Sequence, residues 1–253
     1  MKYRKGEAKE YAREVMKGIW SALPYNFTEN DELDEAAIRQ NVNILIEDLQ
    51  VDGHYCAGNV AEFWALTLEE RKRAQAVMLE AGEGRIPMMA GVHHQSAKEA
   101  LALTRHAQEI GYDFVICLTP YVAAGNDAAI LEFFRYIADR TEIGIVLFNL
   151  PSVSSSIGGE LARHLAEIPS VCAIKQADLN PHATLLLHEA VGNRIVISVA
   201  DEAVWFHNLT QLGHRWLLTY TPHMYQVPGW LPVKKYTDLA MAGEVAKAAA
   251  LSE

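Results

Sequence analysis

The chain has 253 residues, of which half are hydrophobic and 21% are charged, as in a well-packed globular domain. Its net charge of −10 argues against nucleic acid or an anionic membrane surface as a partner. The odd number of cysteines, three, argues against a disulfide framework, and none of them has the spacing of metal ligands. No apolar run reaches the roughly 18 residues of a membrane span, and no signal-peptide core is found, so we expect a cytoplasmic protein.

Apolar segments typical of buried strands alternate with helical segments along most of the chain. The eight strand segments are 18–24, 52–57, 87–92, 113–119, 144–150, 171–177, 194–200 and 215–220. Eight strands that alternate with helices predict a parallel sheet closed into a (β/α)8 TIM barrel. An open, doubly wound sheet is the alternative. It is disfavoured because no Gly-x-Gly-x-x-Gly motif follows the first strand.

The ends of the chain differ from this pattern. Residues 1–17 are charged and helix-prone, and we expect them to form a helical or flexible extension. The barrel is then expected over residues 18–230 and a short C-terminal helix over residues 231–253. Within the barrel, side chains suited to cap helix N-termini precede or begin five helical segments. They are Asp34, Thr67, Ser96, Asp127 and Asp201.

Lys175 lies in the apolar sixth strand, which begins at Val171. A lysine there is costly, because its ammonium loses water on burial. The side chain either extends past the strand end into solvent or remains buried. In the second case desolvation lowers the pKa, and the uncharged amine attacks a carbonyl carbon to form a Schiff base. Functional groups of a barrel gather at the carboxyl ends of the strands, where Lys175 lies, which favours the second case.

Five segments resemble, in order, those of the dihydrodipicolinate synthase / N-acetylneuraminate lyase family of class I aldolases. They are AGNVAEFWALTLEER (57–71), AGVHHQSAKEALALTRHAQEIGYDFVICLTPY (90–121), FNLP (148–151), AIKQA (173–177) and ISVADE (197–202). The resemblance implies a (β/α)8 barrel that forms a homo-oligomer, either a dimer or a tetramer. It also implies an imine between Lys175 and a 2-oxo acid substrate, commonly pyruvate, and no cofactor.

The chain departs from the family pattern at several site positions. The tyrosine usual on the fifth strand is Phe148, and the second tyrosine of the Pro-Tyr-Tyr segment is Val122. The two threonines of the Gly-Thr-Thr-Gly-Glu box are Asn59 and Val60, and the arginine that often follows Tyr-Asn-x-Pro is Val153. These differences predict that the chain does not synthesise dihydrodipicolinate itself.

The resemblance and the strand ends together define a set of candidate site residues. Lys175 is the expected Schiff-base residue, and Tyr121 or His93 is the candidate for the proton transfer that the missing tyrosine would perform. The expected substrate-binding residues are Asn59, Val60, Phe148, Asn149 and Leu218. A metal site formed by His93 and His94 with His223 or Asp201 has no diagnostic spacing, so we assign none.

Three functions remain open at this point. The first is a class I lyase of the aldolase type, which joins or cleaves a 2-oxo acid and an aldehyde through Lys175. The second is a hydro-lyase, or dehydratase, that uses the same imine on a sugar-derived 2-oxo acid. The third is a catalytically impaired relative that keeps the barrel but has lost the tyrosine.

Overall fold

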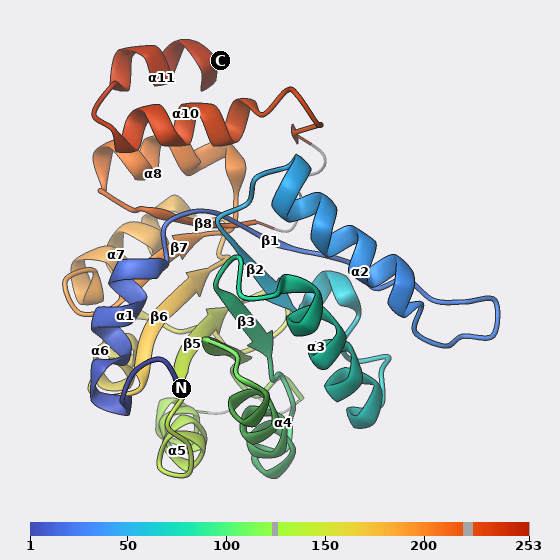
Figure 1. The fold of residues 1–253 in the computed structure, drawn as a ribbon. Coiled ribbons are helices and arrows are strands. Elements are labelled where there is room, and N and C mark those ends of the chain that lie inside the picture. The colour runs from blue at the N-terminus through green and yellow to red at the C-terminus, as the bar shows by residue number, and fades with distance from the viewer. Residues whose placement is uncertain (123–125, 220–224, 253) are drawn as a thin grey trace. The chain divides into compact units, whose positions relative to one another are not determined.

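The computed structural model describes residues 1–122, 126–219 and 225–252. Eight parallel strands close into a barrel in chain order (Figure 1). They are β1 (Gly18–Ala22), β2 (Gly53–Cys56), β3 (Met88–Gly91), β4 (Phe114–Leu118), β5 (Gly144–Asn149), β6 (Val171–Gln176), β7 (Val196–Val199) and β8 (Trp216–Leu218). Each strand lies inside its predicted segment. The (β/α)8 barrel is therefore confirmed, and the open sheet is excluded.

Helices alternate with these strands. They are α1 (Ala8–Val15), α2 (Glu35–Asn43), α3 (Leu68–Gly82), α4 (Ala97–Ile110), α5 (Asp127–Ala138), α6 (Gly159–Leu165), α7 (Pro181–Val191) and α8 (Trp205–Gln211). Four shorter helical turns are η1 (Lys5–Glu7), η2 (Ile44–Asp48), η3 (Asn59–Ala61) and η4 (Glu202–Val204).

Most of the predicted helix caps are confirmed. The side chains of Asp34, Thr67 and Ser96 accept backbone N–H groups at the starts of α2, α3 and α4, and Asp201 does the same for η4. Asp127 is not a cap. Asn126 takes this position because its side chain accepts the N–H of Ala129, which leaves Asp127 as the first helical residue.

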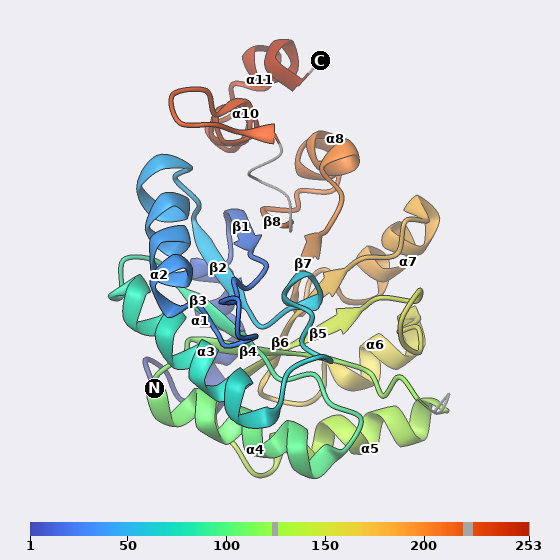
Figure 2. The same ribbon diagram turned by 90° about the vertical axis from the view of Figure 1, so that its right-hand side faces the viewer.

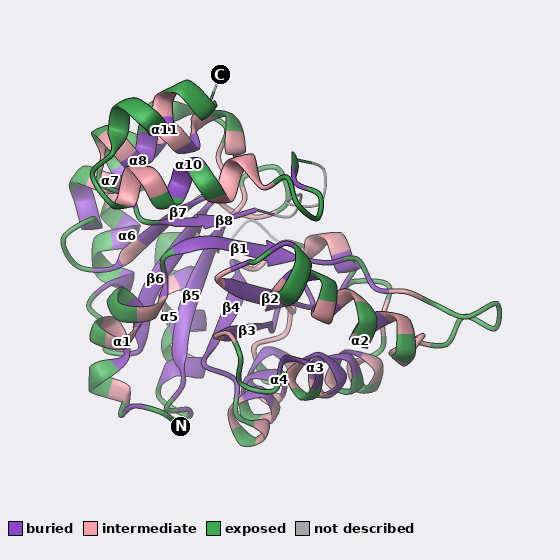
Figure 3. Cartoon of the chain, turned by 45° about the horizontal axis from the view of Figure 1, so that its top comes forward, coloured by how far each residue is buried: buried purple, intermediate pink, exposed green. Residues whose placement is uncertain are grey.

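The strands are buried along their length, except for the partly exposed Val196 at the start of β7 (Figure 3). Every residue of β4, β5 and β6 is buried. This agrees with the continuous apolar runs in the sequence, since parallel strands covered on both faces have no solvent-facing side that favours polar residues.

The chain divides into two compact units. The first unit comprises Met1–Met16 and Met89–Ala200, and the second comprises Lys17–Met88 and Asp201–Glu253. In the first unit, β4 pairs with β3 and β5, and β6 pairs with β5 and β7. Its helices pack in chain order, α4 against α5, α5 against α6 and α6 against α7 (Figure 2). In the second unit, β1 pairs with both β2 and β8.

The N-terminal extension is helical and packs on the first unit. Tyr3 and Tyr11 stack on Phe114 of β4, with ring centroids 5.8 and 5.4 Å from that ring. The hydroxyl of Tyr3 accepts the N–H of Gly144 over 2.8 Å and donates to the carbonyl of Asp113. These contacts join the N-terminal extension to the strands β4 and β5.

The C-terminal extension contains two helices, α10 (Pro232–Met241) and α11 (Val245–Ser252). The division falls at Gly243, whose φ of 86° is in the left-handed region that favours glycine. Within the second unit, α10 packs against α8, and Nε1 of Trp205 donates to Oγ1 of Thr237 over 2.8 Å.

Candidate functional site

The direction of Lys175 follows from the alternation of side chains along β5 and β6. Phe148 is the register partner of Lys175, and Asn149 is that of Gln176. Nε2 of Gln176 donates to Thr184 on α7 over 3.3 Å, so this second pair faces the helix layer. Because successive residues of a strand point to opposite faces, Lys175 and Phe148 face the barrel interior.

Lys175 and Phe148 lie against each other on that interior face. Lys175 is 4% exposed, and its Nζ is 4.5 Å from the centroid of the Phe148 ring. The ring attracts a cation through its π face, but it offers no atom that donates or accepts a proton. Phe148 therefore shapes the surroundings of the amine without taking part in proton transfer.

His93 is a predicted proton-transfer residue that the structure brings to this pair. Its ring is fully buried, with the ring centroid 5.7 Å from that of Phe148. The backbone N–H of Leu118 donates to Nδ1 of His93 over 2.9 Å. A backbone N–H only donates, so in the neutral ring the proton is on Nε2.

His94 has different surroundings. Its side chain is half-buried, and its Nδ1 accepts the N–H of Ser96 over 2.9 Å at the start of α4. Of the two predicted histidines, His93 is therefore the one packed beside Phe148.

Tyr121 is in the loop that follows β4. Oε1 of Gln95 accepts the backbone N–H groups of Tyr121 and Val122, each over 2.7 Å. In the same loop region Oγ1 of Thr119 donates to the carbonyl of Ser155 over 2.7 Å. Gln95 was not among the predicted site residues, although it directly follows the His93–His94 pair in the sequence.

Asn149 holds the loop between β5 and α6. Its Nδ2 donates to Oε1 of Gln176 over 2.7 Å and to the carbonyl of Ile157 over 3.3 Å, and its Oδ1 accepts the N–H of Ile157 over 2.8 Å. The amide faces the helix layer, opposite to Lys175. Substrate binding by Asn149 stays a prediction, and these bonds give the residue a structural role.

Ser198 is a neighbour of Lys175 that the sequence interpretation missed. It is the register partner of Lys175 on β7, so its side chain faces the same interior. The residue is fully buried, and its Oγ has no hydrogen-bond partner in the part of the chain that the structure describes. The sequence signal was a polar residue inside the apolar run of the seventh strand.

The other predicted residues belong to the second unit. Asn59 and Val60 lie in η3 after β2, and Oδ1 of Asn59 is buried without a partner among the described residues. This turn is flanked by Ala57 and Glu62, whose φ angles of 59° and 48° are rare for residues other than glycine. Leu218 is buried at the end of β8. Contacts of Asn59, Val60 and Leu218 with a substrate stay predictions.

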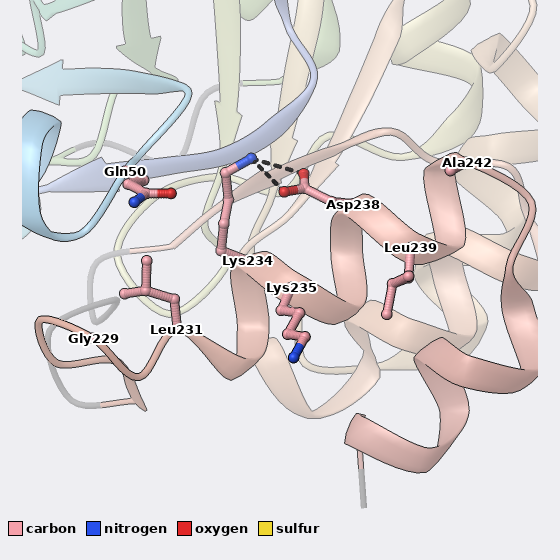
Figure 4. Close-up of a pocket in the computed structure, with 8 residues that line it drawn as sticks. All are labelled: Gln50, Gly229, Leu231, Lys234, Lys235, Asp238, Leu239 and Ala242. Atoms are coloured by element: carbon pink, nitrogen blue, oxygen red, sulfur yellow. Dashed lines mark hydrogen bonds and ion pairs between the residues drawn. The ribbon is translucent and has the colours of Figure 1, made fainter.

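A pocket of about 560 Å³ lies within the second unit, lined by α10, the residues that flank it, and Gln50 and Gly229 (Figure 4). Nζ of Lys234 is 2.7 Å from Asp238 and 3.3 Å from Asp52. Burial lowers the pKa of this ammonium, but the bonds to Asp238 and Asp52 outweigh burial and raise it. Lys234 is therefore held as a charged ion, which makes it a poor nucleophile.

Among the described residues, no group of three or more His, Cys, Asp or Glu side chains could hold a metal ion. Of the residues considered for such a site, Asp201 caps η4 and His223 lies outside the described residues. Within the same described ranges, the helices are too short or too polar to span a bilayer.

The chain is similar to known proteins over most of its length. The profile of the dihydrodipicolinate synthetase family matches residues 15–253. A 4-hydroxy-tetrahydrodipicolinate synthase of Methanothermobacter thermautotrophicus is 31% identical over 163 residues, which are 64% of this chain and 57% of that protein. An N-acetylneuraminate lyase of Histophilus somni is 27% identical over 234 residues, which are 92% of this chain and 78% of that protein.

A solved structure agrees with the fold. It is a prophage protein of E. coli K12 in the dihydrodipicolinic acid synthase family, in complex with pyruvate. It superposes with a TM-score of 0.85 at 23% identity and covers 94% of this chain and 80% of that one.

Proposed function

Because the chain belongs to the dihydrodipicolinate synthetase family, we propose that it is a lyase of the class I aldolase type. The proposed substrate is a 2-oxo acid such as pyruvate, or an adduct of pyruvate, bound as an imine of Lys175. One observation carries this proposal. Lys175 is buried on the interior face of β6, near the carboxyl end of the strand, where barrel enzymes place their reacting groups.

The proposed chemistry begins with the uncharged amine of Lys175. Burial disfavours the ammonium form, which has no lone pair to attack a carbonyl. Nζ adds to the carbonyl carbon of the 2-oxo acid and gives a carbinolamine, which loses water to form the imine. The imine withdraws electrons from the neighbouring carbon, so that a C–C or C–O bond one carbon away is made or broken.

Proton transfer in this site needs a group other than Phe148. His93 is our first candidate, since its Nε2–H is a donor next to the ring that Lys175 contacts. Tyr121 is the second candidate, in the loop after the neighbouring strand. The turn with Asn59 and Val60 is the proposed cradle for the substrate carboxylate, in which backbone N–H groups and the amide of Asn59 replace threonine hydroxyls.

The test is the capture of the imine by borohydride in the presence of pyruvate, followed by intact-mass measurement. We expect a reduced pyruvyl adduct on the wild-type chain and none on Lys175→Ala. Lys234→Ala is the matched control, because Lys234 is also partly buried but is held by carboxylates; this variant should be labelled like wild type. Equal labelling of wild type and Lys175→Ala would refute the assignment of Lys175.

Two further outcomes separate the proposed lyase from its alternatives. A released aldehyde identifies aldol cleavage, whereas loss of water from the substrate with its carbon chain intact identifies a hydro-lyase. An adduct that forms without turnover of the 2-oxo acids tested indicates the catalytically impaired relative. The phenylalanine at position 148 favours this alternative, because it replaces the usual tyrosine.

A further inference from the structure

We propose that Ser198 is a positioning residue of the imine site. Its hydroxyl holds a water molecule that carries the proton from nitrogen to the leaving oxygen when the carbinolamine of Lys175 dehydrates, and back again when the imine is hydrolysed. The proposal rests on the proposed function of Lys175. It adds Ser198 to the imine site, a residue that is not among the positions at which the chain departs from the family pattern.

The first support is the register of β6 and β7. Lys175 and Ser198 are partners across the two parallel strands, and their neighbours Ile174 and Ile197 are partners in the preceding row. Paired residues of adjacent parallel strands point to the same face. Phe148, Lys175 and Ser198 thus form one row on the interior face of the sheet, with Ser198 on the side of Lys175 opposite to Phe148.

The second support is the unsatisfied hydroxyl itself. Ser198 is fully buried, and its Oγ contacts no donor or acceptor of the described residues at hydrogen-bond distance. A buried hydroxyl left without a partner is destabilising, so such groups in folded proteins usually bind water or a ligand. We place such a water molecule between Oγ of Ser198 and the amine of Lys175 on the adjacent strand β6.

The lengths of the Ser198 and Lys175 side chains indicate that a water molecule connects them. A lysine carries its nitrogen on a four-carbon stem, whereas a serine hydroxyl stands on a single carbon. Oγ therefore lies beside the lysine stem, short of Nζ. One water bound to Oγ bridges that difference, and bridging waters of this kind are nearly as favourable as direct hydrogen bonds.

The proposed step is balanced in atoms and charge. In the carbinolamine the substrate carbon carries a hydroxyl and the N–H of Lys175. Nitrogen donates its lone pair to form the C=N bond as the C–O bond breaks, and the oxygen takes up the proton that nitrogen loses. The bound water accepts the proton from nitrogen and passes one of its own to the leaving oxygen, so one new water molecule is released. Hydrolysis is the same sequence in reverse.

Exchange of the carbonyl oxygen of pyruvate with water labelled with heavy oxygen measures this cycle, because each dehydration and rehydration replaces that atom. The rate at saturating pyruvate, minus the rate with Lys175→Ala, reports imine turnover. We expect Ser198→Ala to lower this rate about tenfold to a hundredfold, at or below the low end of general acid–base contributions. The amount of adduct trapped at equilibrium should not change, and Ser198→Thr, which keeps the hydroxyl, should restore much of the rate.

Ser170 provides a matched control. It is also fully buried with an Oγ that has no partner among the described residues, but it precedes the amino end of β6. Ser170→Ala should leave the exchange rate at the wild-type value. If Ser198→Ala lowers the thermal unfolding midpoint too far for kinetics, Ser198→Cys keeps a group of similar shape with only a weak donor and should show the same loss of rate.

The outcomes separate this inference from the proposed function. Exchange in wild type that equals the Lys175→Ala background would refute the imine itself, and the role of Ser198 with it. Exchange that depends on Lys175 but is equal in wild type, Ser198→Ala and Ser198→Cys would overturn the role of Ser198 alone. Equal losses in Ser198→Ala and Ser170→Ala would show a general effect of cavities near β6, which also overturns it.

Discussion

The backbone N–H of Leu118 donates to Nδ1 of His93 over 2.9 Å, which places the proton of the neutral ring on Nε2. His93 is thereby a hydrogen-bond donor beside Phe148, and it cannot use Nδ1 as a base without losing the bond to Leu118. We therefore interpret His93 as the group that protonates the carbonyl oxygen of the 2-oxo acid as Nζ adds and the carbinolamine forms, the step before its dehydration.

His93→Ala should slow the formation of the borohydride-trappable adduct, by about a hundredfold if His93 supplies general acid catalysis. The measurement is the initial rate of adduct formation by intact mass at fixed pyruvate. His94→Ala is the control and should react like wild type, because His94 is bonded to Ser96 at the start of α4. Equal rates for His93→Ala and wild type would remove His93 from the mechanism.

Phe148→Tyr tests whether the site has been rebuilt around an apolar ring. In an active lyase that uses His93, the site is built around an apolar ring, so the added hydroxyl should leave activity on the true substrate unchanged or reduced. In an impaired relative, the restored phenol should instead speed adduct formation with pyruvate, by about tenfold or more. A gain in Phe148→Tyr with no loss in His93→Ala would contradict the active lyase.

His54 should make the fold less stable in acid. This residue of β2 is fully buried, its Nδ1 lies 3.1 Å from Oγ of Ser21, and burial lowers its pKa to about 4. Between the unfolded value near 6.5 and this folded value, the unfolded chain binds more protons, so stability falls as the pH decreases. The contribution of His54 lost between pH 7 and pH 5 is of order 2 kcal/mol.

Urea unfolding of wild type and His54→Gln at these two pH values measures this effect. The variant is expected to be less stable at neutral pH but to lose less stability in acid. His164→Gln, at an exposed position on α6, should keep the wild-type pH dependence. A pH dependence that is the same in His54→Gln and wild type would assign the acid sensitivity to other groups.

Gly18 is required where β1 begins. Its φ is 71°, and a Cβ there would lie 2.0 Å from Oδ2 of Asp52, the atom that accepts the N–H of Ile19 over 2.9 Å. Gly18→Ala should therefore cost the left-handed strain of about 1–2 kcal/mol and also displace this carboxylate, which adds about 1–3 kcal/mol. Gly84→Ala, with a φ of 69° and no atom near its Cβ, should cost the strain alone. If Gly18→Ala and Gly84→Ala lower the free energy of unfolding equally, the displacement of Asp52 has no energetic cost.

The sequence by itself determined the order of the elements and the identity of the central lysine. The strands are apolar runs, and because a parallel strand is covered on both faces, such a run is a strong local signal. Most helix starts were predictable for the same local reason, since Asp34, Thr67 and Ser96 bond to N–H groups only three residues away. A polar residue in an apolar strand is equally visible, as with Lys175.

Only the tertiary structure decided which side chains face Lys175. Asn149 and Lys175 both follow apolar runs, yet they point to opposite faces, because the register of β5 and β6 pairs Asn149 with Gln176 and Phe148 with Lys175. The proton position on His93 depends on Leu118, 25 residues further along the chain. Ser198 became a candidate only when β7 was placed beside β6. Such relations depend on strand register and hydrogen bonds between distant residues, and no local pattern in a sequence encodes them.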